Sequence, residues 1–166
     1  MKIILTGTTG FIGKEILSQC LSHPAITSIV ILTRRDLPTT DPKVQIYRMQ
    51  DDDFLSYSSP QLTAALRGAH ACIWSLGVVP SRASDAQAIR RVTVDFTEQA
   101  AQAFTRTCSG SGSRFRFVYL SGSLAERDQS KSLWFSGPYR RVRVCFSPFF
   151  ILDRLSVYRR QLITIF

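Results

Sequence analysis

The chain has 166 residues, of which 45% are apolar and 20% charged, and its net charge is +9. This length fits one domain, and the composition is typical of a folded globular protein rather than a disordered chain. Because no apolar run reaches the roughly 18 residues of a membrane span, and the first apolar stretch is too short for a signal peptide, we expect a cytoplasmic protein without a transmembrane segment.

The positive charge is concentrated in the last part of the chain. Residues 131–166 carry a net charge of +6 and 8 of the 18 aromatic residues, whereas residues 1–130 carry only +3. We therefore predict two parts, a globular domain over 1–130 and a basic aromatic tail over 131–166. The basic residues are few and accompany no nucleic-acid-binding motif, so we expect no nucleic-acid partner.

The cysteines and histidines give no sign of a metal site. The four cysteines are 52, 36 and 37 residues apart, which is too far for a metal-binding or redox pair: Cys20, Cys72, Cys108 and Cys145. We expect buried free thiols and a reducing intracellular compartment. Neither histidine, His23 or His70, has a partner that suggests a metal centre or a catalytic triad.

Short β-rich runs alternate with stretches of helical periodicity along the first 120 residues. The pattern predicts strands at 2–6, 27–33, 44–49, 69–76 and 115–120. It predicts helices at 11–22, 60–68 and 84–107, and loops at 36–42 and 109–113. This order favours an α/β fold, a Rossmann-like doubly wound parallel sheet of about five strands, with one irregular crossover and a truncated C-terminal part.

A glycine-rich segment joins the first predicted strand to the first predicted helix, with spacing G-x-x-G-x-x-G: Gly7, Thr8, Thr9, Gly10, Phe11, Ile12 and Gly13. Gly7 permits a tight turn, Gly10 lets the backbone approach a pyrophosphate, and Gly13 lets the helix lie close to the sheet. The helix N-terminus offers unpaired N–H groups to phosphates. In this context the segment predicts a dinucleotide site rather than a turn with packing glycines.

Two arginines, Arg34 and Arg35, follow the second predicted strand. Domains selective for NAD usually have an acidic residue there, which binds the ribose 2′-hydroxyl. Guanidinium groups instead suit a 2′-phosphate, because they make paired, charge-assisted hydrogen bonds to it. The pair favours NADP(H) as cofactor. Asp36 keeps NAD as an alternative, and the pair is also compatible with an exposed basic loop.

With these motifs the chain resembles the extended and atypical short-chain dehydrogenase/reductase superfamily over about residues 1–130. The matching segments are TGTTGFIG at 6–13, the arginine pair, Asp53-Phe54 after the third strand, WSLGV at 74–78 and VYLSGS at 118–123. The resemblance implies an NAD(P)-binding Rossmann domain in which Asp53, with Asp52 a close competitor, lies near the adenine. It further implies that a segment at the end of the fourth strand lines the cofactor ribose: Ser75, Leu76 and Gly77.

The same resemblance implies an active-site serine, which matches Ser121, or Ser123 by a small shift. Family members use a tyrosine and a lysine four residues later for proton transfer during hydride transfer. No Tyr-x-x-x-Lys occurs in this sequence, and the nearest substitute is Tyr139 with Arg143. Arginine differs from lysine in geometry, so the pair is also compatible with chance in a basic run.

Residues 144–166 do not resemble the continuation found in the family. Their apolar residues follow a helical spacing, which suits a short helix packed on the sheet or a basic amphipathic segment at a membrane surface. A third interpretation is that truncation, alternative splicing or an incorrect gene model placed this sequence after the fold.

Three functional hypotheses follow. The leading one is an NADP(H)-binding, reductase-like protein that transfers hydride to a small carbonyl or alcohol substrate where it is catalytically competent. The second is a non-catalytic regulator that senses NADP(H) and binds a protein partner. The third is an inactive fragment whose open sheet leaves an uncovered edge.

Overall fold

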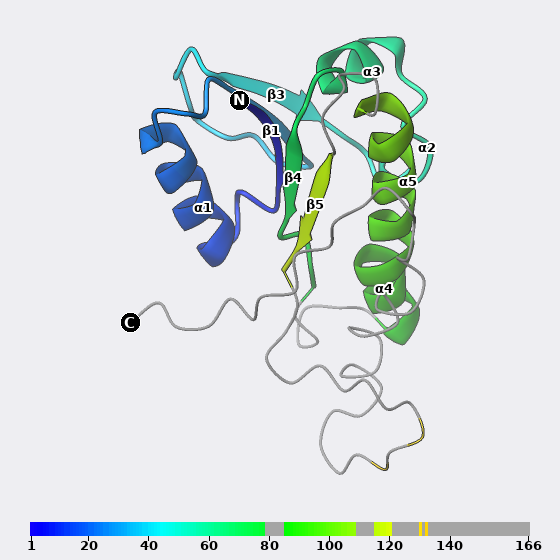
Figure 1. The fold of residues 1–166 in the computed structure, drawn as a ribbon. Coiled ribbons are helices and arrows are strands. Elements are labelled where there is room, and N and C mark those ends of the chain that lie inside the picture. The colour runs from blue at the N-terminus through cyan, green and yellow to red at the C-terminus, as the bar shows by residue number, and fades with distance from the viewer. Residues whose placement is uncertain (79–84, 109–114, 121–129, 131, 133–166) are drawn as a thin grey trace.

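The computed structural model describes residues 1–78, 85–108, 115–120, 130 and 132. In these residues a parallel sheet has the strand order β3-β2-β1-β4-β5 (Figure 1). The strands are β1 (Lys2–Thr6), β2 (Ser28–Thr33), β3 (Val44–Arg48), β4 (Ala71–Trp74) and β5 (Arg116–Tyr119). This order is that of the first five strands of a doubly wound Rossmann sheet, so the predicted fold class is confirmed.

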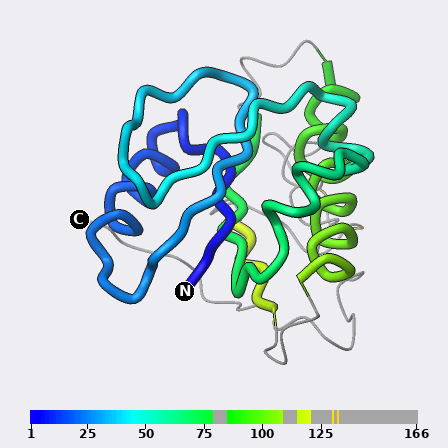
Figure 2. Tube along the Cα trace, turned by 90° about the horizontal axis from the view of Figure 1, so that it is seen from above, coloured from blue at the N-terminus to red at the C-terminus, as the bar shows by residue number. Residues whose placement is uncertain are grey.

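Helices cover both faces of the sheet, as Figure 2 shows from above. On one face lies α1 (Phe11–Ser22), and on the other lie α2 (Asp53–Ser56), α3 (Pro60–Leu66), α4 (Ala86–Arg90) and α5 (Phe96–Cys108). A π-helical turn, η2 (Arg91–Asp95), joins α4 to α5. The single helix predicted over 84–107 is therefore interrupted, and in the wider turn three consecutive residues are buried: Val92, Thr93 and Val94.

Alternate side chains of each inner strand enter two separate cores. In β1, Ile3 and Leu5 pack with Leu17 and Cys20 of α1, whereas Ile4 packs on the opposite face with the aromatic residues under α5. Both cores are apolar, which explains why the inner strands are continuous apolar runs rather than alternating ones.

The larger core is centred on Phe104 of α5. Its ring lies 5.2 Å from that of Tyr57, 6.5 Å from that of Trp74 and 6.2 Å from that of Phe117, measured between centroids. Side chains from three elements and the residue that follows α2 thus meet at one aromatic cluster, which fixes α5 against the sheet.

The elements differ from the prediction at α2 and at the ends of several strands and helices. The helix α2 was not predicted, because its four residues are too few to show a helical period. The fourth strand is shorter than 69–76, and it ends at Trp74, where the chain turns toward the glycine loop. The connection from β2 to β3 contains no helix, as the irregular crossover suggested. The loop predicted at 109–113 lies outside the described residues.

Three of the four cysteines, Cys20, Cys72 and Cys108, are buried free thiols, as predicted, and Cys145 lies outside the described residues. Burial raises the pKa of the Cys72 thiol well above its ordinary value and that of Cys108 to about 11. His70 accepts a hydrogen bond from the Lys2 backbone N–H at 3.3 Å, so it helps to align β1 with β4. Within the described residues no cluster suits a metal ion and no helix is long and apolar enough to cross a membrane.

Replacing Phe104 with Ala should lower the free energy of unfolding by about 3–5 kcal/mol, because the fully buried ring leaves a cavity in the aromatic cluster. Chemical denaturation followed by circular dichroism measures the change. Gln102→Ala, at an exposed position of the same helix, is the matched control and should change stability by less than about 0.5 kcal/mol. Equal losses in the two variants would contradict this assignment of the core.

Candidate functional site

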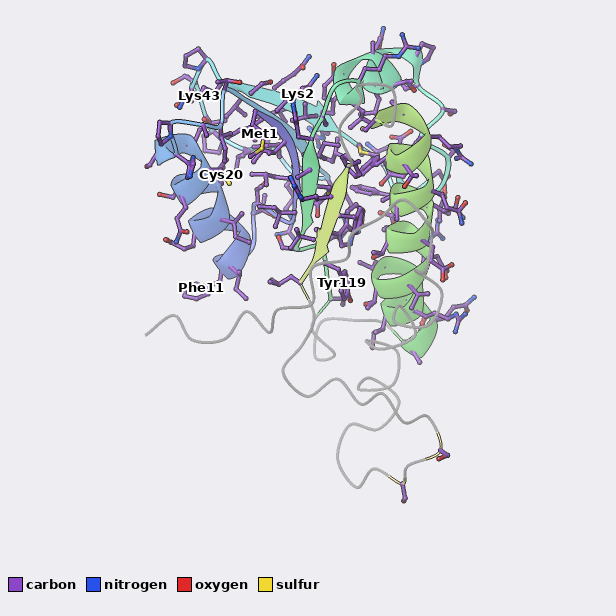
Figure 3. All side chains as sticks on the ribbon, in the orientation of Figure 1. Met1, Lys2, Phe11, Cys20, Lys43 and Tyr119 are labelled. Atoms are coloured by element: carbon purple, nitrogen blue, oxygen red, sulfur yellow. The ribbon has the colours of Figure 1, made fainter. Side chains whose placement is uncertain are left out.

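The candidate site lies at the edge of the sheet where the parallel strands end. Because all strand pairs are parallel, the loops that follow β1, β2, β3 and β4 emerge along this edge. In Figure 3, Phe11 at the start of α1 and Tyr119 at the end of β5 mark the same edge. Open parallel sheets bind ligands at this edge, near the point where strand order reverses, here between β1 and β4.

The glycine loop between β1 and α1 is held by close backbone contacts. Gly7 has φ +69°, which favours glycine, and its carbonyl accepts a hydrogen bond from the Gly10 N–H at 2.9 Å. A Cβ on Gly13 would overlap the Gly7 carbonyl group. Gly13 therefore brings α1 against the end of β1. The prediction was close packing of the helix on the sheet, and the structure shows that the contact is with the backbone of Gly7.

Gly10 differs from the other two glycines, because a Cβ there would have only the Gly7 carbonyl oxygen within 4 Å, at 3.2 Å. It is the N-cap of α1, where it makes no side-chain capping bond, and the first turn contains no acidic residue. The first N–H groups of α1 are thus free of a competing capping side chain in the described part of the chain. A helix N-terminus in this state attracts an anion.

The remaining side chains of the loop divide into buried and exposed. The Thr8 side chain is buried and its Oγ1 has no hydrogen-bond partner among the described residues, while Thr9 is half-buried. Phe11 and Ile12 extend outward, with 94% and 49% of their surface exposed. A buried hydroxyl without a partner is uncommon in folded proteins, whereas a single exposed apolar side chain is ordinary.

The end of β4 packs directly on the glycine loop. The Ser75 Oγ donates a hydrogen bond to the Thr6 carbonyl at 2.6 Å, and the Ser75 N–H donates to the Thr6 Oγ1 at 3.2 Å. A Cβ on Gly7 would lie 2.5 Å from the Ser75 carbonyl oxygen. The structure thus brings Ser75 beside the loop, whereas half-buried Leu76 packs against the larger core and Gly77 is exposed.

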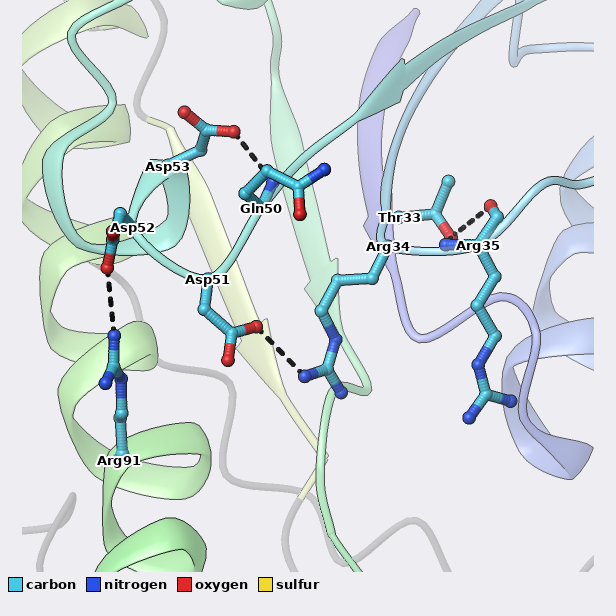
Figure 4. Close-up of polar contacts among 8 residues, drawn as sticks. All are labelled: Thr33, Arg34, Arg35, Gln50, Asp51, Asp52, Asp53 and Arg91. Carbon is cyan, nitrogen blue, oxygen red and sulfur yellow. Dashed lines mark hydrogen bonds and ion pairs between the residues drawn. The ribbon is translucent and has the colours of Figure 1, made fainter.

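The two arginines after β2 are positioned by Thr33. The Thr33 Oγ1 accepts a hydrogen bond from the Arg35 N–H at 3.1 Å and donates to the Arg35 carbonyl at 2.9 Å, which fixes the turn. The side chains diverge in Figure 4, where Arg34 extends to Asp51 and forms an ion pair at 3.0 Å. Arg35 has no ion-pair partner among the residues that the structure describes.

Asp36, the acidic residue that left NAD open as an alternative cofactor, pairs with an arginine of β3. Its carboxylate accepts a hydrogen bond from Arg48 of β3 at 2.9 Å, and the side chain is 85% exposed. This pair lies at the outer strand of the sheet, away from the centre of the binding edge.

Three successive aspartates occupy the connection from β3 to α2. Asp53 accepts a hydrogen bond from the Gln50 N–H at 2.7 Å and so closes the turn that begins α2. Asp52 is 93% exposed and pairs with Arg91 at 3.0 Å, while the Arg91 guanidinium lies 5.9 Å from the centroid of the Phe96 ring. Asp52 and Asp53 both follow β3, at the candidate binding edge. The carboxylate of each already accepts a hydrogen bond, from Arg91 and from the Gln50 N–H respectively.

Sequence reasoning missed the roles of Asp51 and Arg91. Asp51 could have been found from charge complementarity, because three acidic residues follow β3 and two basic residues follow the adjacent β2. Arg91 gave no such signal, because its partner Asp52 is 39 residues away in sequence. The candidate catalytic residues Ser121, Tyr139 and Arg143, as well as Ser123, lie outside the described residues.

The sequence of the chain is similar to that of a longer fungal protein. The chain is 35% identical over 121 residues to "Leucinostatins biosynthesis cluster protein T" of Purpureocillium lilacinum, a match that covers 73% of this chain and 42% of that protein. The chain therefore spans less than half the length of this relative. No protein-family model matches the sequence.

Solved structures share the fold. A short-chain dehydrogenase/reductase from Burkholderia vietnamiensis superposes with a TM-score of 0.72 at 18% identity, covering 94% of this chain and 81% of that one. A mutant uronate dehydrogenase from Agrobacterium tumefaciens, complexed with NAD, gives a TM-score of 0.56 at 15% identity, covering 80% and 45%. The predicted resemblance to the short-chain dehydrogenase/reductase superfamily is confirmed at the level of the Rossmann fold.

Replacing Gly13 with Ala should lower the free energy of unfolding by about 1–3 kcal/mol, because the added methyl group overlaps the Gly7 backbone and must displace α1. Gly10→Ala is the matched control and should cost clearly less, because its methyl group meets a single atom. Denaturant titration of both variants measures the difference. A larger loss for Gly10→Ala would show that the loop packs differently.

Proposed function

We propose that this chain binds a nicotinamide dinucleotide at the edge formed by the glycine loop, and that it prefers NADP(H) to NAD(H). One observation carries the proposal: the Gly7–Gly13 loop leaves an uncapped helix N-terminus and an open Gly10 at the point where strand order reverses. The fold shared with dehydrogenases, one of them complexed with NAD, supports the same cofactor class.

The residues of the edge fit the parts of such a cofactor. The pyrophosphate suits the first N–H groups of α1, with Thr8, Thr9, Phe11 and Ile12 around it. The buried Thr8 Oγ1, which has no partner within the described part of the chain, supplies a polar atom for a ligand or water there. We assign the ribose to Ser75, which lies against Gly7, and to Leu76 and Gly77, which follow it.

The preference for NADP(H) rests on Arg34 and Arg35. Both are exposed and follow β2, where a dinucleotide ribose lies in Rossmann domains. Arg35 has no ion-pair partner among the described residues, and Asp36 is already bound by Arg48. A 2′-phosphate therefore meets at least one available cation and no free carboxylate from Asp36. Asp53, which closes its own turn, is assigned to the adenine end of the site.

Reduction of a small carbonyl compound is the chemistry that we propose for the complete reaction, in which the bound dinucleotide supplies hydride. Ser121 would bind the carbonyl oxygen, and Tyr139, with Arg143 as its positive neighbour, would donate the proton. We propose that residues 1–130 bind the cofactor and contribute Ser121, and that the rest of the substrate is recognised outside this range.

Binding of cofactor without turnover is the second candidate function. It is favoured by the sequence, which contains no Tyr-x-x-x-Lys. The two functions share the cofactor site and differ in one observable, the oxidation of NADPH in the presence of aldehydes and ketones. Steady oxidation with any substrate supports reduction, whereas tight binding with no oxidation across a broad panel supports a regulatory protein.

Titration of the full chain with NADPH and NADH tests the cofactor, with the change in NADPH fluorescence or the heat of binding as the signal. We expect both to bind and NADPH to bind more tightly. Arg34→Ala/Arg35→Ala should weaken NADPH binding at least about tenfold and leave NADH nearly unchanged, since a hydrogen bond to a charged group contributes about 1.5–3 kcal/mol.

Arg106→Ala is the matched control, because Arg106 is an exposed arginine in the last turn of α5 and pairs with neither Asp36 nor Asp51. It should leave the ratio of the two dissociation constants unchanged. Failure of the wild-type chain to bind either dinucleotide would refute the proposed function, whereas tighter binding of NADH would refute only the preference for NADP(H).

A further inference from the structure

Arg34, one of the two arginines assigned to the 2′-phosphate, is already paired with the carboxylate of Asp51. The Asp51 Oδ1 accepts a hydrogen bond from Arg34 Nη1 at 3.0 Å, and the two side chains are 48% and 40% exposed. The residues are 17 positions apart in sequence but follow adjacent parallel strands, β2 and β3, whose register pairs Thr33 with Arg48. Arg34 is thus partly neutralised by a neighbour that the fold itself places there.

The segment that carries Asp51 is held on its far side. Asp52 is tied to Arg91, Asp53 closes the turn on the Gln50 N–H, and Phe54 is fully buried, with its ring stacked 5.2 Å from that of Phe96. Asp51 therefore follows a fixed backbone, whereas Arg34 has a long side chain that can reorient. A 2′-phosphate that binds Arg34 must displace the guanidinium from Asp51 or accept a negative charge beside it.

We propose that Asp51 is a specificity-determining residue that weakens the preference for a 2′-phosphate by holding Arg34, so that Arg35 is the main phosphate-binding cation. This inference rests on the proposed function, because it concerns the same cofactor site. Asp51 opposes the bound 2′-phosphate and has no such effect on NADH, which lacks that group. The preference of the chain for NADP(H) is therefore smaller than its two arginines alone would give.

The test is the ratio of the dissociation constants for NADPH and NADH, measured by isothermal titration calorimetry on the full chain. Asp51→Asn keeps the size of the side chain and removes its charge. It should tighten NADPH binding about two- to fivefold, since exposed ion pairs are weak, and leave NADH binding unchanged. The gain should shrink as ionic strength rises, because the charges are exposed.

Two further variants separate competition from other roles of Asp51. Glu15→Gln removes an exposed charge from α1, on the other face of the sheet, where the carboxylate accepts a hydrogen bond from Gln19 and pairs with neither Arg34 nor Arg35, so the ratio should not change. In an Arg34→Ala background the effect of Asp51→Asn on the ratio should disappear.

The outcomes distinguish this inference from the proposed function. A wild-type chain that binds neither dinucleotide overturns the proposed function. A wild-type chain that binds both, with an Asp51→Asn variant whose ratio is unchanged or shifts toward NADH, overturns the role of Asp51 alone. Thermal unfolding by circular dichroism confirms that each variant is folded before its ratio is used.

Discussion

The close approach of three backbone segments at the end of β1 is the constraint on which the site depends. Gly7 lies against the Ser75 carbonyl on one side and against Gly13 on the other, and a Cβ on Gly7 or Gly13 would meet backbone atoms. Backbone cannot reorient as a side chain can, so this contact fixes the start of α1 relative to β1 and β4. The direction of the helix N-terminus, and with it the place for a phosphate, follows from the contact.

The aromatic core extends this constraint to the outer part of the edge. Phe54 of α2 stacks on Phe96 of α5, and Trp74, the last residue of β4, lies edge-on to Phe54 at 6.4 Å. The three aspartates that precede Phe54 are thereby placed beside the end of β2, although α2 has only four residues. Charge pairs on the surface are weak alone, and here they are aligned by a core that does not depend on them.

Sequence periodicity predicted the strands of the sheet and α1, but it did not predict the connections between the elements. The apolar runs of β1 and β2 and the glycine spacing depend on neighbours close in sequence, so local pattern predicted them. The pairs Arg34–Asp51 and Arg91–Asp52 join residues 17 and 39 positions apart in the sequence. No periodicity encodes such contacts, although the acidic and basic runs after two adjacent strands contained the information for one of them.

The distribution of charge over the binding edge explains why residue type alone gives an incomplete account of cofactor choice. Five arginines lie near the ends of β2, β3 and α4, and three of them are paired with aspartates: Arg34 with Asp51, Arg48 with Asp36, and Arg91 with Asp52. Counting arginines would give a strongly basic site, yet an incoming phosphate experiences the sum of fixed charges around it. In this fold that sum is set by which aspartate the core places beside each guanidinium, so under the proposal for Asp51 a carboxylate after β3 influences a preference usually attributed to the residues after β2.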